Sequence, residues 1–147
     1  MWITSFIRYD ITNDNWAELN GKLHKSTTSD NLRTNLVWSW FLTMKALVIG
    51  AGGVGRAIAN IASRRSFVTS MVIADRTLAR AEEAVYRVRD PRFSAAQVNA
   101  AELEDLRELI RKADPDVVIN AVDPRFVMPI FLACEIENTN YIDMAMS

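Results

Sequence analysis

Four of the chain's five glycines lie within six consecutive residues, Gly50-Ala51-Gly52-Gly53-Val54-Gly55, directly after the apolar run 46–49. Their spacing fits GxGxxG, the pattern of a tight turn from a β-strand into an α-helix. In this pattern Gly50 makes the turn and Gly55 lets the helix pack closely on the sheet, and both roles need a missing Cβ. The sequence therefore predicts that a strand ends and a helix begins within this stretch.

The residues after the turn support a helix. Apolar groups at Val54, Ile58, Ile61 and Ala62 have helical spacing, which predicts one buried face. The first amides of such a helix lack intrahelical partners, and the helix dipole places positive charge at that end. A diphosphate would bind there, with the backbone approaching it at Gly52. The alternative is that the glycines form a plain tight connection.

An acid follows the next predicted strand. Residues 68–74 are apolar and β-branched, and Asp75 comes directly after them. A carboxylate at this position accepts hydrogen bonds from the adenosine ribose and repels a 2′-phosphate, so we expect a dinucleotide and favour NAD over NADP. Arg76 could instead reach a phosphate, which would permit NADP as well. Otherwise Asp75 is a solvated acid at a strand end.

Strands and helices alternate from Met44 onward, which predicts an α/β fold with a doubly wound parallel sheet, Rossmann-like, in strand order 3-2-1-4-5. We expect later strands at 93–98, 116–122 and 141–144. We expect one helix after Thr77 as N-cap that ends near Asp90-Pro91, one from Leu103 that stops at Asp114-Pro115, and one within 124–137. The last strand would lie at an open sheet edge, where a homo-oligomer could form.

Ligands bind at the carboxyl ends of such strands, so the candidate site residues lie where strands end. Asn99 would lie near the adenine, and residues 120–122 near the nicotinamide. Asp123 and Asp143 would face the same side, but nothing in the sequence identifies a catalytic residue. The predicted cofactor-binding residues are Gly50, Gly52, Gly53, Val54, Gly55, Asp75, Arg76, Asn99, Asn120, Ala121 and Val122.

Composition limits the function classes. The chain has 147 residues and a net charge of -1, which indicates one domain and favours neither nucleic acid nor membrane as a partner. Its one cysteine, Cys134, cannot form an internal disulfide, which fits a cytoplasmic location and leaves no thiolate metal site to predict. The apolar stretch 36–44 is about half as long as a membrane span requires.

Residues 1–43 differ from the rest. All four tryptophans lie there, and no helical or strand period is sustained. We therefore expect a poorly structured N-terminal extension that is dispensable for folding, followed by a dinucleotide-binding domain at 44–147.

Four segments together resemble the saccharopine dehydrogenase family: residues 45–55, 73–77, 114–121 and 140–143. The first two also fit shikimate dehydrogenase and glutamyl-tRNA reductase, whereas the last two are more specific. Relatives often have Asp where this chain has Asn99. The resemblance covers residues 44–147 and implies the family's N-terminal NAD(P)-binding domain.

The same resemblance implies hydride transfer at a carbon bonded to nitrogen, in amines derived from amino acids. Family members continue into a substrate domain, which at this length the chain lacks. We therefore expect cofactor binding without turnover unless a longer product or a partner chain supplies that domain. Two alternatives are a stand-alone nucleotide-binding or redox-sensing module and an inactive truncated product.

Overall fold

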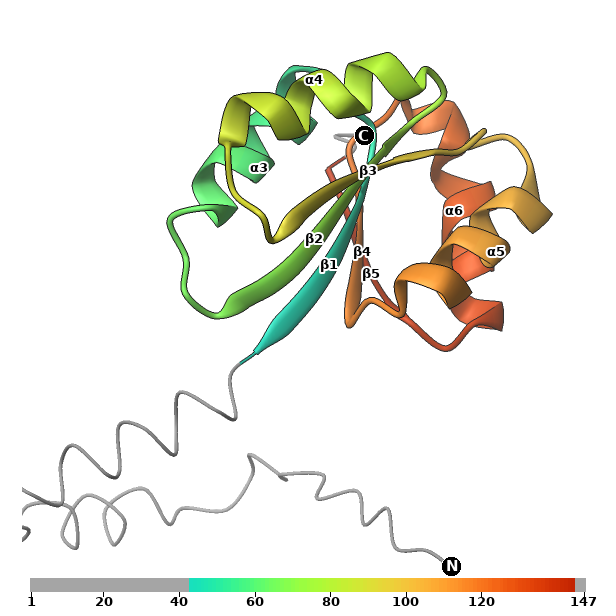
Figure 1. Ribbon diagram of the computed structural model, residues 1–147. Coiled ribbons are helices and arrows are strands. Elements are labelled where there is room, and N and C mark those ends of the chain that lie inside the picture. The colour runs from blue at the N-terminus through green and yellow to red at the C-terminus, as the bar shows by residue number, and fades with distance from the viewer. Residues whose placement is uncertain (1–42, 145–147) are drawn as a thin grey trace, which may run out of the picture. The chain divides into compact units, whose positions relative to one another are not determined.

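The computed structural model describes residues 43–144, which form a five-stranded parallel sheet with helices on both faces (Figure 1). In chain order the elements are β1 (Met44–Ile49), α3 (Gly53–Ala62), β2 (Val68–Asp75), α4 (Leu78–Val88), β3 (Phe93–Gln97), α5 (Leu103–Ala113), β4 (Val117–Asn120), η1 (Pro124–Phe126), α6 (Val127–Ile136) and β5 (Asn140–Asp143). The predictions for residues 1–42 lie outside the described residues.

The strand order is β3-β2-β1-β4-β5, which confirms the predicted doubly wound topology. β1 is central, and its last residue, Ile49, lies beside Ala74 of β2 and Asn120 of β4. Because all neighbouring strands are parallel, their carboxyl ends meet at one edge. The topology therefore brings the glycine turn, Asp75 and the residues after β4 together, although they are far apart in the sequence.

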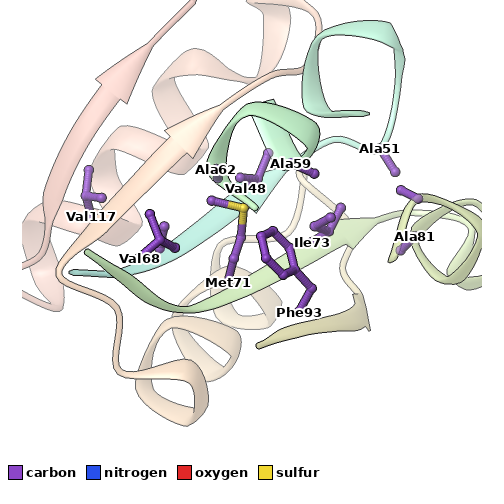
Figure 2. Close-up of a cluster of buried hydrophobic side chains, with 12 residues drawn as sticks. Val48, Ala51, Ala59, Ala62, Val68, Met71, Ile73, Ala81, Phe93 and Val117 are labelled. Atoms are coloured by element: carbon purple, nitrogen blue, oxygen red, sulfur yellow. The ribbon is translucent and has the colours of Figure 1, made fainter. Parts of the chain in front are cut away.

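Each face of the sheet has its own core. α3 and α4 cover one face, where large side chains such as Met71, Ile73 and Phe93 come from the strands and small alanines come from the helices (Figure 2). α5 and α6 cover the other face, where Leu106 and Ile130 pack against Leu47. Burial of apolar surface on both faces stabilises the sheet.

The predicted buried face of α3 was wrong in its details. Ala62 is buried and Ile58 is partly buried, as predicted, but Val54 and Ile61 are 46% and 59% exposed, and Gly55 and Ala59 are buried in their place. Small residues face the sheet because the helix approaches it too closely for larger ones, so the apolar pattern indicated a helix but not its packing face.

Several element boundaries also differ from the predictions. β4 is shorter than the predicted 116–122 because the Asn120 side chain turns the chain, with its Oδ1 accepting a hydrogen bond from the Val122 N–H (3.1 Å). Thr77 does occupy the N-cap of α4, but its side chain makes no capping hydrogen bond. Instead the Thr77 N–H donates to Asp75 Oδ1 (3.0 Å).

The last helix and strand expose apolar side chains. α6 is apolar except for Glu135, with Met128, Leu132 and Ile136 exposed, and β5 exposes Ile142 at the edge of the sheet. In the described part of the chain, no helix has the length and hydrophobicity that crossing a membrane requires.

Candidate dinucleotide site

Two glycines of the turn are required by the protein's own packing. Gly50 has φ +113°, and a Cβ there would lie 2.6 Å from the carbonyl oxygen of Ala121. A Cβ on Gly55 would overlap the carbonyl oxygen of Gly50. The turn is fixed on both sides, because the Gly50 N–H donates to Ala74 O (2.7 Å) and the Ala121 N–H donates to Ile49 O (2.8 Å). Side chains at these two positions would force the helix and sheet apart.

The other two glycines are not required by packing. A Cβ on Gly52 or Gly53 would meet no atom within 4 Å. Gly52 has φ −74°, a conformation that any residue can adopt, and within residues 43–144 the one glycine with positive φ is Gly50. The missing side chains therefore leave open space above the turn, where a ligand could approach the backbone.

The start of α3 faces this space. Gly52 is the N-cap and contributes no side chain, and the first helical hydrogen bond runs from Arg56 N–H to Gly52 O (3.0 Å). The amides of residues 53–55 precede that bond, and the first turn contains no acidic residue. Such a helix start attracts an anion.

Asp75 is buried, and its carboxylate is hydrogen-bonded to two backbone amides. Oδ2 accepts from the Ala51 N–H (2.9 Å) and Oδ1 accepts from the Thr77 N–H (3.0 Å), while the residue is 9% exposed. The carboxylate thereby joins the glycine turn to the turn after β2. Its nearest charged neighbour is Arg80, whose Nη1 lies 4.0 Å from Oδ1.

A cavity of about 460 Å³ opens beside Asp75 at the carboxyl edge of the sheet. Its walls come from the ends of β1, β2, β3 and β4, with α4 and η1 at the rim. The lining residues are Ile49, Gly50, Asp75, Arg76, Thr77, Arg80, Val98, Asn99, Ala100, Ala101, Val122, Arg125 and Phe126. The lining combines apolar groups with several polar and charged side chains, as a site for a polar small molecule requires.

Asn99 lines this cavity, and its predicted contact with the adenine stays a prediction. Its Oδ1 accepts from the Ala101 N–H (3.2 Å), and its carbonyl accepts from the Glu102 N–H (3.0 Å). These bonds fix the turn between β3 and α5 and leave the side-chain amide N–H groups available. An amide donor can serve an adenine nitrogen, so an Asn is chemically suited to this position.

The three residues predicted after β4 differ in exposure. Asn120 is fully buried, and its Nδ2 donates to the Tyr141 hydroxyl (3.0 Å) while its Oδ1 accepts from Val122. Ala121 and Val122 are partly exposed, and Val122 lines the cavity. Asn120 thus lies beneath the surface, where it orients the loop that carries the other two.

The two acids considered for the nicotinamide side occupy different settings. Asp123 caps η1, and hydrogen bonds from the Arg125 backbone and guanidinium hold its pKa below the ordinary value. A carboxylate with a lowered pKa is a poor proton donor at neutral pH. Asp143 is exposed at the end of β5. Neither acid lines the cavity.

Sequence reasoning missed Arg80, Arg125 and Phe126, all of which line the cavity. A signal existed for Arg80, because it lies in the first turn of the helix that follows the strand-end acid. Arg125 and Phe126 depend on η1 folding back toward the sheet, which the residue pattern did not indicate. Residues 43–144 contain no group of three or more His, Cys, Asp and Glu side chains arranged to hold a metal ion.

Comparison with known proteins identifies the family. Residues 46–147 match the saccharopine dehydrogenase NADP-binding domain. The chain belongs to the saccharopine dehydrogenase family. The match covers the described sheet from β1 to β5 and confirms the resemblance inferred from the motifs.

Two curated relatives support this membership. A carboxynorspermidine synthase from Vibrio cholerae is 34% identical over 113 residues, covering 71% of this chain and 27% of the relative. A carboxyaminopropylagmatine dehydrogenase from Synechocystis sp. is 27% identical over 101 residues, covering 69% of this chain and 25% of the relative. The chain thus spans about a quarter of the length of these relatives.

Solved structures show the same fold. Apo saccharopine dehydrogenase (L-Glu forming) from Saccharomyces cerevisiae matches with a TM-score of 0.62 and 19% identity, over 71% of this chain and 22% of that one. A short-chain dehydrogenase/reductase from Veillonella parvula, solved in complex with NADP, matches with a TM-score of 0.58 and 14% identity, over 71% of this chain and 48% of that one. These likenesses show a shared Rossmann-like fold. The matched family domain is described as NADP-binding, which is the cofactor class expected from the sequence.

Proposed function

We propose that residues 44–147 are the NADP(H)-binding domain of an oxidoreductase that acts on C–N bonds of amines derived from amino acids. The observation that carries this proposal is the open space over Gly52 and Gly53. Neither the packing nor the backbone conformation requires glycine at these two positions. A pyrophosphate held by the backbone at the start of α3 accounts for both missing side chains.

The other predicted contacts follow from this placement. The adenosine would occupy the cavity between Asn99 and Val122, with Arg76 at its rim. The nicotinamide would lie beyond Ala121, on the side where β4 ends. When bound, the nicotinamide supplies the hydride acceptor or donor, while the chain's own residues bind and orient the cofactor.

We favour NADP(H) over NAD(H), which revises the preference drawn from the sequence. That preference assumed that the charge of Asp75 repels a 2′-phosphate. In the structure each Asp75 oxygen accepts one backbone N–H, and Arg80 Nη1 lies 4.0 Å from Oδ1, so the negative charge is offset. Three arginines line the same cavity: Arg76, Arg80 and Arg125. The match to a domain named for NADP binding supports the same choice.

The proposal of a C–N substrate rests on the family and on the names of its members, a carboxynorspermidine synthase and a carboxyaminopropylagmatine dehydrogenase. Substrate positioning can contribute roughly 7–11 kcal/mol toward lowering a reaction barrier. Since this chain spans about a quarter of those relatives, we propose that further polypeptide supplies that positioning. A cytoplasmic location and self-association at the sheet edge remain predictions.

Calorimetric titration of the purified chain with NADPH and NADH tests the proposal. We expect binding of both, with NADPH tighter, and no substrate-dependent NADPH formation from NADP with saccharopine, lysine or carboxylated polyamines. A folded chain that binds neither cofactor would contradict the binding function and favour an inactive product. Turnover by the purified monomer would contradict the need for further polypeptide.

A further inference from the structure

We propose that Tyr141 of β5 is a positioning residue for the nicotinamide half of the cofactor. It acts through Asn120, whose buried side chain shapes the loop 121–123 after β4. This role rests on the proposed function and deepens it, because it explains how the chain holds the end of the cofactor where hydride transfer takes place. The sequence pattern did not single out Tyr141, which lies 21 residues beyond Asn120.

The Asn120 side chain holds the loop from within. Asn120 is the last residue of β4 and is fully buried, and its Oδ1 accepts from the Val122 N–H (3.1 Å). The loop is also tied to β1, because the Ala121 N–H donates to Ile49 O (2.8 Å). A side-chain amide has an acceptor on one side and a donor on the other. The loop therefore keeps this shape only while the amide of Asn120 faces in one direction.

Tyr141 fixes that direction. Its hydroxyl oxygen accepts from Asn120 Nδ2 (3.0 Å). Its ring packs edge-on against the ring of Phe131 in α6, with the centroids 5.7 Å apart, so the hydroxyl has a defined place. If the amide turned over, its N–H₂ group would face the Val122 N–H, and two donors would oppose each other. Because Asn120 is fully buried, losing the tyrosine oxygen would leave a buried donor without a partner, which is unfavourable.

The tyrosine hydroxyl also connects this pair to the end of β5. Burial raises the pKa of the Tyr141 hydroxyl, and the Asp143 carboxylate, which interacts with the same hydroxyl, raises it further. The hydroxyl therefore keeps its proton at neutral pH, and it can donate toward the carboxylate while it accepts from Asn120. Asp143 lies beside Asn120 in the parallel pairing of β4 and β5. The polar groups at these two strand ends thus share one direction of hydrogen bonding.

The loop that this pair holds borders the path of the cofactor. The Ala121 carbonyl oxygen lies against the glycine turn, 2.6 Å from where a Cβ on Gly50 would be. A dinucleotide with its pyrophosphate at the start of α3 must pass this loop to reach the side where β4 ends. Neither Asn120 nor Tyr141 lines the cavity proposed for the adenosine. A shift of the loop should therefore affect the nicotinamide half more than the adenosine half.

Two ligands that differ by the nicotinamide isolate this role. NADPH carries the nicotinamide and 2′-phospho-ADP-ribose does not, whereas both carry the pyrophosphate and the phosphorylated adenosine. We expect the unmodified chain to bind NADPH more tightly in calorimetric titrations. Tyr141→Phe should weaken NADPH binding by about fivefold or more and change binding of 2′-phospho-ADP-ribose by less than about twofold. Tyr86→Phe is the matched control, because it removes the same hydroxyl from a residue that is 73% exposed, and it should change neither affinity.

The fluorescence of bound NADPH provides a second measurement, because the nicotinamide is the emitting group. We expect the emission of NADPH bound to Tyr141→Phe to differ from that of NADPH bound to the unmodified chain, with Tyr86→Phe unchanged. Circular dichroism and thermal midpoints establish that the variants fold. If Tyr141→Phe does not fold, Phe131→Leu displaces the hydroxyl without removing it, and it should lower the ratio of the two affinities in the same direction.

The outcomes separate the two proposals. A selective loss of NADPH affinity in Tyr141→Phe, with changed emission, supports the role of Tyr141. If the two affinities fall together, or if neither falls, Tyr141 does not position the nicotinamide, while cofactor binding stands. If the unmodified chain binds both ligands equally tightly, the nicotinamide makes no contact and the role is again wrong. If the unmodified chain binds neither ligand, the proposed function fails and the role of Tyr141 fails with it.

Discussion

The two sides of the sheet, divided at β1, present different surfaces. On the β2–β3 side, polar groups converge on one cavity, and its central acid, Asp75, is satisfied by the protein's own backbone. On the β4–β5 side, α6 and β5 expose apolar side chains such as Leu132, Ile136 and Ile142. A site formed from backbone and strand ends can be complete within one domain, whereas an exposed apolar face indicates an interaction surface. We infer that the adenosine end of the cofactor binds on the first side, and that the apolar surface of α6 and β5 contacts further polypeptide or a second copy of the chain.

The largest expected effect is on stability, through the close contact between Gly55 of α3 and the Gly50 carbonyl oxygen. Gly55→Ala places a Cβ against the Gly50 carbonyl oxygen, where backbone cannot move without shifting α3 from the sheet. We expect a loss of about 3 kcal/mol or more in the free energy of unfolding, measured with urea. Gly53→Ala is the matched control, because its Cβ meets no atom within 4 Å, and it should be as stable as the unmodified chain. Equal stability of the two variants would contradict the packing role of Gly55.

The second effect should appear in binding and not in stability. Gly52→Ala adds a methyl group to open space at a φ that alanine adopts readily, so the unfolding free energy should stay within about 0.5 kcal/mol. If that space holds the pyrophosphate, NADPH affinity should fall by about tenfold or more, measured by calorimetry. Unchanged NADPH affinity would mean that the dinucleotide does not approach Gly52.

The third prediction concerns the acid between the two turns. Asp75→Asn keeps one acceptor oxygen but turns an amide N–H₂ toward a backbone N–H, and we expect a cost of about 1–3 kcal/mol in stability. Removing the negative charge beside Arg80 should also raise the affinity for NADPH relative to NADH. A selective loss of NADH affinity, with NADPH affinity unchanged, would instead show that Asp75 accepts hydrogen bonds from the ribose in the unmodified chain, and would contradict a role as an anchor alone.

The sequence predicted the arrangement of the sheet well because its signals are local. The turn at Gly50, the acid after β2 and the alternation of apolar segments each depend on neighbouring residues, and together they predicted the order β3-β2-β1-β4-β5. The site was predicted less completely, because the direction in which a side chain points and its hydrogen-bond partners depend on tertiary contacts. The pattern placed Asp75 at the correct strand end but not its bonds to Ala51 and Thr77.

Similar reasons explain the remaining differences. Val54 and Ile61 suggested a buried face by hydrophobicity, yet the short distance between α3 and the sheet admits Gly55 and Ala59 there instead. Asn120 was predicted to contact the cofactor. Its side chain is buried and donates a hydrogen bond to Tyr141 of β5, a residue 21 positions later. Such long-range contacts leave no local pattern in one sequence.

The fourth prediction tests the second side of the sheet. Met128 and Ile136 of α6 are 59% and 52% exposed, so replacing both with Lys removes little buried surface and should change stability by less than about 1 kcal/mol. If this face drives self-association, the double variant should shift the chain toward monomer in sedimentation velocity. Glu135→Lys, also exposed on α6, is the control for added positive charge. Unchanged self-association in the double variant would exclude this face as the contact surface.

The smallest expected effect is the pH dependence due to Cys134, which is buried on the sheet-facing side of α6. Burial raises the pKa of its thiol from 9.0 to about 11. The folded state therefore favours the neutral thiol, and the resulting stability is fully present below pH 9 and declines as the pH rises toward about 11. Cys134→Ala removes this contribution. Tyr141 and all other groups titrate in both proteins. The difference in unfolding free energy between the unmodified chain and Cys134→Ala therefore reports the contribution of the thiol alone. We expect the unmodified chain to lose stability relative to Cys134→Ala between about pH 8 and about pH 10 in urea titrations. A constant difference over this range would mean that the Cys134 thiolate forms as readily in the folded chain as in the unfolded one.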